Sequence, residues 1–235
     1  MSNSLLIRTL PWDSDFFHLR IGRVDVHAAT DWELLREMVE SGQAPFDLLY
    51  VFSDAELPAP LPAARRVDTK VVYRKMVSPA EPSEDGHILE FEGTVPDAEL
   101  YRLALVSGRY SRFNVDERFP EGSYERLYRR WIENSVNGLC AETVLCYVEG
   151  DSTLGFVTLG MNAGEGEIGL IAVDPHWQGH GIGAKLIRAA ERRLQARGVD
   201  SLEVATQQDN TTACHFYEKC GFVKKSGTDI YHLWI

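Results

Sequence analysis

The hydrophobic pattern is clearest in the second half of the chain, where a short apolar run precedes a long amphipathic stretch. Residues 168–173 form an apolar segment without polar alternation, as is typical of a strand buried on both faces. From Ile182 to Leu194, apolar side chains recur at helical spacing and basic side chains fill the other positions. The pattern predicts a central strand, a loop and then a helix over residues 184–197.

The same periodicities predict the remaining elements and their order along the chain. Residues 11–15 are expected to form a turn, and residues 108–122 an irregular loop. Helices are expected at residues 31–41, 98–107, 124–137 and 211–220. Strands are expected at residues 19–26, 48–52, 70–73, 88–91, 144–148, 154–159, 202–206 and 231–235. Hairpin connections together with one strand-helix-strand crossover predict an α/β fold of the α+β kind, with a mixed, mostly antiparallel central sheet flanked by helices.

Two parts of unequal size are expected. Residues 1–85 are predicted to form a smaller, partial αβ module, and residues 86–235 the main domain. A stretch rich in proline, glutamate and serine over residues 78–86 is the predicted linker, and a proline-rich connection covers residues 57–62.

Charge and cysteine content narrow the functional classes. The formal net charge is −11 and no segment concentrates Lys and Arg, so we expect no nucleic-acid partner. No apolar run approaches the roughly 20 residues of a membrane span, and the first residues lack the features of a signal peptide, so a cytoplasmic protein without a membrane partner is expected. The four cysteines match no common zinc spacing; buried thiols are preferred over a site, and no metal is expected.

A glycine-rich loop over residues 178–183 joins the central strand to the helix. Its three glycines free the backbone of Cβ, so that consecutive N–H groups can converge on an anion at a helix N-terminus. A triphosphate-binding loop is excluded because Ala184 follows Gly183 where a lysine is needed. A dinucleotide fingerprint fits poorly, because its spacing differs and its acidic candidate, Glu203, falls inside a strand. The remaining alternative to a phosphate cradle is an ordinary glycine turn.

The loop resembles the acetyl-CoA pyrophosphate loop of the GNAT N-acetyltransferase superfamily. The resemblance rests on Gln178-x-x-Gly181-x-Gly183 after a strand and after Val173-Asp174-Pro175. It implies a GNAT fold and acetyl-CoA as cosubstrate. It also implies cofactor contacts from the strand end, the loop and the start of the last helix: Ile171, Ala172, Val173, Gln178, Gly179, His180, Gly181, Ile182, Gly183, Ala184 and Asn210.

Two residues are candidates for proton transfer. Asn210 and Tyr217 are seven residues apart and return to nearly the same face of the last predicted helix. The resemblance implies that Tyr217 protonates the departing thiolate, against the alternative of a core aromatic. Glu167, at the start of the central strand, is the candidate base that deprotonates the amine, with Glu165 and Glu203 as rivals and a surface carboxylate as the plain alternative.

The resemblance narrows to enzymes that acetylate the amine of a nucleotide-linked 4-amino-4,6-dideoxy sugar. Four segments carry it: residues 12–17, 111–113, 130–134 and 204–207. It implies a dTDP-linked amino sugar as acceptor. The long loop carries a cluster that can clamp a diphosphate and stack on a base: Arg109, Tyr110, Arg112 and Phe113.

Other outcomes stay open. The acceptor can instead be another small amine or a peptide N-terminus, and a catalytically degenerate acyl-CoA-binding module is the alternative to an enzyme. A homodimer is one option for the assembly.

Overall fold

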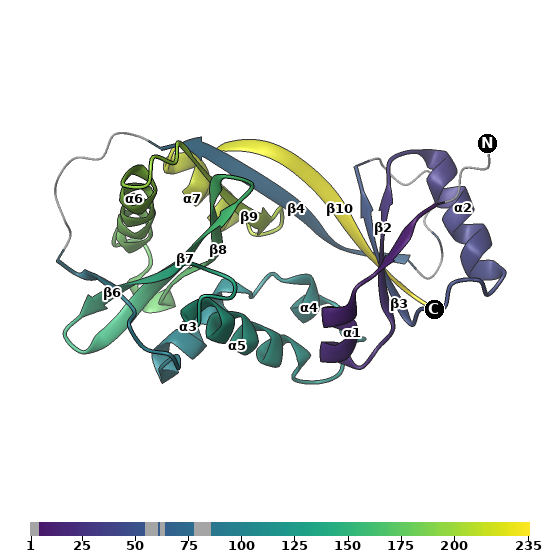
Figure 1. Cartoon of the computed structure of the whole chain (residues 1–235), viewed down its shortest axis with the longest axis horizontal. Coiled ribbons are helices and arrows are strands. Elements are labelled where there is room, and N and C mark those ends of the chain that lie inside the picture. The colour runs from purple at the N-terminus through teal and green to yellow at the C-terminus, as the bar shows by residue number, and fades with distance from the viewer. Residues whose placement is uncertain (1–4, 55–60, 62–63, 78–85) are drawn as a thin grey trace.

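A ten-stranded sheet runs through the described part of the chain, residues 5–54, 61, 64–77 and 86–235 of this computed structural model (Figure 1). Its strand order is β1-β2-β3-β10-β4-β9-β8-β7-β6-β5. The strands are β1 (Ile7–Thr9), β2 (Ile21–Val26), β3 (Leu48–Ser53), β4 (Ala64–Met76), β5 (Ile88–Glu90), β6 (Thr143–Glu149), β7 (Ser152–Asn162), β8 (Glu165–Val173), β9 (Ser201–Gln207) and β10 (Val223–Trp234). The helices are α1 (Pro11–Phe17), α2 (Ala29–Glu40), α3 (Ala98–Ser107), α4 (Arg112–Val115), α5 (Ser123–Val136), α6 (Ile182–Gln195) and α7 (Thr211–Lys219), with a short 3₁₀ turn η1 (Pro175–Trp177).

The sheet is mixed, and most of its neighbouring strands are antiparallel. Only β2 with β3 and β8 with β9 pair in parallel among the described strands. A parallel pair needs a crossover, which the chain provides with α2 in the first case and with α6 in the second. The expected fold class is therefore confirmed.

Two long strands, β4 and β10, hold the sheet together across its middle (Figure 1). β10 pairs with β3 through residues 229–234 and with β4 through residues 223–233. β4 continues the sheet on its other side by pairing with β9. Strands from the first 85 residues and from the rest of the chain thus share one set of backbone hydrogen bonds.

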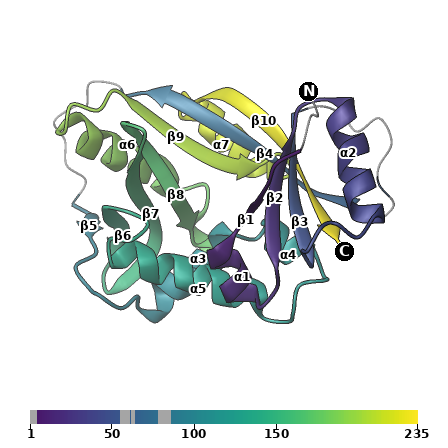
Figure 2. The ribbon, with the colours of Figure 1, turned by 45° about the vertical axis from the view of Figure 1, so that its right-hand side comes forward.

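Helices cover both faces of the sheet around β7 and β8 (Figure 2). On one face, α6 and α7 pack with Val157, Ile168 and Val204 in an apolar cluster. On the other, α3 and α5 pack with Phe156 and Leu170. Because successive strand residues point to opposite faces, Val157 packs with α6 and α7 whereas Phe156 packs with α3 and α5.

The N-terminal strands have a core on each face as well. Trp32 and Leu35 of α2 pack on β2, β3 and the end of β10. On the opposite face, Phe17 of α1 and Phe113 of α4 stack at 5.4 Å between ring centroids, against Tyr50 of β3.

Three local expectations were wrong, and each has a physical reason. The turn expected at residues 11–15 is the beginning of α1, where Pro11 occupies a first-turn position and Trp12 stacks on Phe16 at 5.0 Å. The irregular loop contains α4, capped by Ser111, whose side chain accepts from the N–H of Phe113. The last strand begins at Val223, eight residues before the expected start, because pairing with β4 organises its polar first half. The predicted linker and the proline-rich connection lie almost entirely outside the described residues.

Candidate active site at the parting of β8 and β9

The central strand β8 carries a bulge where it runs beside β7. Val157 pairs with Ile171 and Leu159 with Ile168, so two residues of β8, Gly169 and Leu170, oppose Thr158 alone. The N–H of Leu170 donates to Oγ1 of Thr158 at 2.8 Å. The bulge also turns the strand over, because Ile168 faces α6 and α7 whereas Leu170 faces α3 and α5.

Beyond the bulge, β8 and its parallel neighbour β9 separate. Only three residue pairs join them, the last being Ile168 with Val204. β8 continues to Val173 and β9 to Gln207 without pairing with each other. The inner edge of β8 over residues 169–173 therefore offers backbone N–H and C=O groups to a ligand that inserts between the two strands.

The glycine loop begins directly at the end of this open edge. Gly179 and Gly181 have φ values of +82° and +79°, in the left-handed region that favours glycine, and an added Cβ on either would meet nothing within 4 Å. Within the described residues, none of the N–H groups of residues 179–184 donates to a backbone carbonyl. These N–H groups lie at the N-terminus of α6, where the helix dipole favours an anion.

Side chains hold the loop against the rest of the sheet. Asp174 ends β8, accepts from the N–H of His176 at 2.8 Å and forms an ion pair with Arg102 of α3 at 2.7 Å. Nε2 of Gln178 donates to the carbonyl of Val173 at 3.2 Å, and Nδ1 of His180 lies 3.1 Å from the carbonyl of Gln178. The loop is thus braced by polar contacts that leave its N–H groups available.

Helix α7 follows β9 and packs against the start of α6, where Phe216 lies beside Gly183. Asn210 caps the helix, its Oδ1 accepting from the N–H of Ala213 at 3.2 Å. Tyr217 is 4% exposed and packs between Tyr73 and Phe222. Burial, with nearby Cys214 and Cys220, raises the pKa of Tyr217 above its ordinary value, so the phenol is protonated at neutral pH.

Gly183 serves packing as well as the loop. An added Cβ at this residue would lie 2.9 Å from the ring of Phe216. The close contact between α6 and α7 therefore requires a glycine here, whatever the residue contributes to a ligand.

The three candidate carboxylates differ in their surroundings. Glu165 forms an ion pair with Arg74, and Glu203 forms one with Lys225. Burial raises the pKa of Glu203, but contacts with Lys225 and Glu165 and the charge of Arg74 outweigh it, so the pKa lies below its ordinary value. Glu167 is exposed and forms no ion pair with any described residue.

The residues expected to bind the acceptor do not act as one group. Arg109 and Tyr110 are exposed, Tyr110 by 40%. Arg112 is half-buried, its guanidinium carbon 4.9 Å from the ring centre of Tyr50 and 4.6 Å from that of Phe113. Phe113 is only 6% exposed inside an aromatic cluster, so it belongs to the core and offers no open ring face to a nucleobase.

The sequence patterns did not predict several residues of the site. Thr158 and Arg102 are single polar residues in otherwise ordinary elements, and their partners are distant in the sequence. Gly169 did carry a signal, because a glycine inside an apolar strand often marks a bulge.

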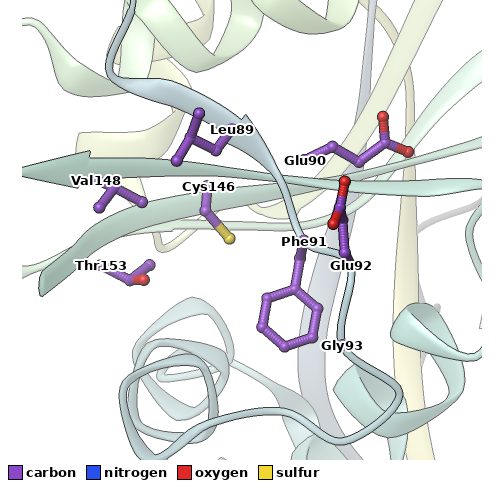
Figure 3. Close-up of a pocket in the computed structure, with 8 residues that line it drawn as sticks. All are labelled: Leu89, Glu90, Phe91, Glu92, Gly93, Cys146, Val148 and Thr153. Atoms are coloured by element: carbon purple, nitrogen blue, oxygen red, sulfur yellow. The ribbon is translucent and has the colours of Figure 1, made fainter. Parts of the chain in front are cut away.

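A separate pocket lies at the β5 edge of the sheet (Figure 3). It is lined by Leu89, Glu90, Phe91, Glu92, Gly93, Cys146, Val148 and Thr153. Burial, with Asp97 nearby, raises the pKa of Cys146 to about 12, which makes this thiol unreactive. The pocket contains none of the predicted site residues.

None of the described helices has the length and apolar character needed to cross a membrane. No cluster of three or more His, Cys, Asp or Glu side chains that could hold a metal occurs in the same part of the chain.

Known structures share this architecture. A protein of unknown function from Staphylococcus epidermidis superposes with a TM-score of 0.63 at 13% identity, covering 100% of this chain and 93% of that one. A GCN5-related N-acetyltransferase from Sphaerobacter thermophilus superposes with a TM-score of 0.58 at 16% identity, covering 97% and 76%. Identities this low establish the fold alone.

Sequence comparisons identify relatives with higher identity to this chain than these structures have. A dTDP-fucosamine acetyltransferase from Escherichia coli O6:H1 is 36% identical over 142 residues, 59% of each chain. A mycothiol acetyltransferase from Nocardia farcinica is 27% identical over 210 residues, 80% of this chain and 64% of that one. The chain thus matches about three fifths of the length of these relatives.

The model of the acetyltransferase (GNAT) family matches residues 104–222, about half of the chain and the segment that contains the bulge, the glycine loop and α7. The chain therefore belongs to the GNAT family of acetyltransferases.

Proposed function

We propose that this protein transfers the acetyl group of acetyl-CoA to a primary amine, and that the amine belongs to a dTDP-linked amino-deoxy sugar. The observation that carries the proposal is the parting of β8 and β9 directly beside a loop of unpaired N–H groups at the start of α6. A long ligand with a peptide-like arm at one end and a pyrophosphate at the other fits this arrangement.

The proposed cofactor contacts follow from which backbone groups lack partners. The pyrophosphate accepts from the N–H groups of residues 179–184, with Gln178 and His180 supporting the loop. The amide-containing arm lies along residues 171–173 of the open edge of β8. Asn210 adds its side-chain amide nitrogen, since its oxygen is already used as the helix cap.

Acetyl-CoA supplies the acetyl group as a thioester. Glu167 accepts a proton from the acceptor ammonium, which frees the nitrogen lone pair for attack on the carbonyl carbon. A C–N bond forms, the C–S bond breaks, and Tyr217 donates its phenolic proton to the departing sulfur. The attacked nitrogen still carries one proton more than the amide product, and the transfer of this proton to the Tyr217 phenolate restores the phenol. The protonated state of the buried Tyr217 and the absence of an ion pair at Glu167 among the described residues support these roles.

The choice of acceptor is supported by the name of one relative and by the surface near the site. The bacterial relative with 36% identity is a dTDP-fucosamine acetyltransferase. Arg109 and Tyr110 lie exposed on the segment between α3 and α4, where they can contact a nucleotide diphosphate. We further propose that residues 1–85 form an accessory part that completes the acceptor side of the sheet, and that residues 86–235 hold the catalytic groups.

A thiol-release assay tests the function. The protein is incubated with acetyl-CoA and a panel of dTDP-linked amino sugars, polyamines, amino acids and peptide N-termini. We expect turnover with a dTDP-linked amino sugar and little with the other amines. Efficient turnover of a peptide or small amine, with no nucleotide sugar accepted, would replace the substrate class. Acetyl-CoA binding without any turnover would favour a degenerate acyl-CoA-binding module.

A further inference from the structure

One face of the sheet beside the parted strands carries an ordered row of side chains. Val71 and Tyr73 of β4 pack towards α6 and α7, so the alternate residues Val72, Lys70 and Asp68 point to the opposite face. Glu203 and Glu167 lie on this opposite face as well, because their neighbours Val204 and Ile168 pack towards α6 and α7. We call it the acceptor face.

The row runs away from the proposed site of acetyl transfer. Val72 pairs with Ala205, the first residue of β9 beyond its last pair with β8. Asp68 lies four residues before Val72, or about 13 Å along the strand. A small amine cannot span this distance from the transfer site, whereas a sugar joined through a diphosphate to a nucleoside can.

At the far end of the row, two oppositely charged groups lie near each other without pairing. Asp68 is 8% exposed, and its Oδ1 has no hydrogen-bond partner. Nε of Arg112 is buried and also has none. The sheet register places the two residues near each other, because the guanidinium carbon of Arg112 lies 5.7 Å from the ring centre of Phe52, and Phe52 and Asp68 pair with Ile230 from its two sides. Burial raises the pKa of Asp68 to about 6, and the charge of Arg112 opposes this rise.

The position of Arg112 favours a single hydrogen bond donated to a ligand over a two-pronged contact with a diphosphate. Its guanidinium is stacked against Tyr50 and Phe113. Burial raises the pKa values of both Asp13 and Asp68, and the charge of Arg112 opposes the rise in each, so two carboxyl groups lie close to it. Two carboxylates beside it would repel a diphosphate. Lys70, between Asp68 and Val72, is exposed and forms no ion pair with a described residue, although its charge also acts on Asp68. Its free ammonium can turn towards a diphosphate, whereas the guanidinium of Arg112 is held between two rings, so Lys70 is the better diphosphate partner.

We propose that Asp68 and Arg112 form a nucleobase subsite that binds the imide edge of the thymine, with Lys70 beneath the diphosphate and the amino sugar extending past Val72 to Glu167. Oδ1 of Asp68 and Nε of Arg112 are both covered in the structure, so these side chains must turn towards the thymine as it binds. The imide N–H then donates to Oδ1 of Asp68, and an adjacent carbonyl accepts from Nε–H of Arg112. An unpaired buried acceptor and an unpaired buried donor thereby gain partners, each of which otherwise costs about 1–3 kcal/mol. The inference rests on the proposed function and deepens it by assigning a part of the acceptor to each residue.

Equilibrium binding of dTDP tests the subsite without catalysis. Calorimetry is performed with saturating CoA, so that the glycine loop is already occupied. The probes are dTDP, N3-methyl-dTDP, which lacks the imide N–H, and thymidine, which lacks the diphosphate. We expect N3-methyl-dTDP to bind at least ten-fold more weakly than dTDP, the effect of one lost hydrogen bond to a charged group.

Two variants assign the contacts. Asp68→Asn replaces the carboxylate with an amide, whose oxygen is an uncharged and weaker acceptor for the imide N–H. It should weaken dTDP binding about ten-fold and reduce the difference between dTDP and its N3-methyl form, while CoA affinity stays unchanged and reports correct folding. Lys70→Met should weaken dTDP but not thymidine. Its matched control is Lys224→Met, an exposed lysine that pairs with Tyr73 and so lies on the opposite face.

The outcomes separate this proposal from the function itself. Equal affinity for dTDP and N3-methyl-dTDP, unchanged dTDP affinity in Asp68→Asn, or no dTDP binding at all would overturn the subsite. Binding as expected, without acetylation of any dTDP-linked amine, would overturn the proposed reaction and leave the subsite standing. Acetylation of dTDP-linked amines by an Asp68→Asn variant with an unchanged KM would overturn the subsite alone.

Discussion

Glu167 and Glu203 lie opposite each other in the register of β8 and β9, one residue before the last pair that joins the two strands. Both point to the acceptor face, but only Glu203 is held by cations, Lys225 and more distantly Arg74. A base must be able to take a proton from the incoming amine, and a carboxylate already bound to cations is poorly suited to that task. Glu167 is therefore the residue of this pair that we assign to deprotonation.

Replacing Glu167 with Gln should lower kcat by roughly 10²–10⁴-fold, the range for a lost general base. The affinity for acetyl-CoA should not change, because Glu167 precedes the open edge of β8. Glu165→Gln is the matched control on the same strand. It breaks a partly exposed ion pair with Arg74 and should alter stability by less than about 1 kcal/mol and kcat only slightly. Equal losses of kcat in the two variants would contradict the assignment.

Replacing Tyr217 with Phe should keep the ring packing between Tyr73 and Phe222 and remove only the hydroxyl. If this hydroxyl protonates the leaving thiolate, kcat falls by roughly 10²–10⁴-fold while KM for acetyl-CoA barely moves. Tyr73→Phe is the control, since its ring lies 5.8 Å away and its hydroxyl donates to Glu218. Wild-type turnover in Tyr217→Phe, with chemistry rate-limiting, would restore a packing role for this residue.

The glycine loop can be tested with two substitutions that impose the same backbone strain. Gly181 and Gly198 lie at opposite ends of α6, have φ values of +79° and +70°, and have nothing within 4 Å of an added Cβ. Alanine at either position should cost roughly 1 kcal/mol of stability.

Only Gly181→Ala should also weaken acetyl-CoA binding, by about ten-fold, because its Cβ enters the space proposed for the pyrophosphate. Calorimetry on both folded variants measures this difference. Equal acetyl-CoA affinity in Gly181→Ala and Gly198→Ala would exclude the loop as the pyrophosphate site. Gly183 is unsuited to the test, since a side chain there would strike Phe216.

Local patterns were sufficient to predict the loop, α6 and α7, because glycine spacing and helical periodicity are properties of short segments. The long strands were harder to predict. β10 begins with the polar stretch that follows Val223, and only its pairing with β4 makes it a strand. Pairing of this kind depends on residues about 150 positions away, which no local propensity reports.

The site shows the same division between local and tertiary information. The glycine loop and Tyr217 stand in recognisable motifs. By contrast, Asp68 is one charged residue in a polar stretch, and its burial follows from α4 and β10 packing around it. Phe113 was expected to meet ligand because it lies beside two arginines, but the aromatic side chains of α1 and β3 bury it.

The pH dependence of stability should report the buried pair formed by His232 and Asp116, whose Nδ1 and Oδ2 atoms are 2.7 Å apart. Burial lowers the pKa of His232 to about 4 although the hydrogen bond to Asp116 raises it. The folded protein thus binds this proton less tightly than the unfolded chain, so stability is lost as the pH falls from about 6.5 to about 4, by up to about 3 kcal/mol.

Urea unfolding of the wild type and of His232→Asn between pH 7 and pH 4 measures this contribution. Asparagine keeps an N–H near the position of Nδ1 and has no titrating ring, so its acid slope should be shallower. His215→Asn, on the exposed surface of α7, should retain the wild-type slope. Parallel acid slopes for the wild type and His232→Asn would contradict a neutral, buried imidazole.

Hydrogen exchange with and without acetyl-CoA tests most directly whether the cofactor enters between β8 and β9. The N–H groups of residues 179–184 have no backbone acceptor in the described structure, and the inner edge of β8 over residues 169–173 has no strand partner. Bound acetyl-CoA should slow exchange in both segments and leave β1 and β2 unchanged. Saturating acetyl-CoA that binds without slowing exchange in either segment would contradict this placement of the active site.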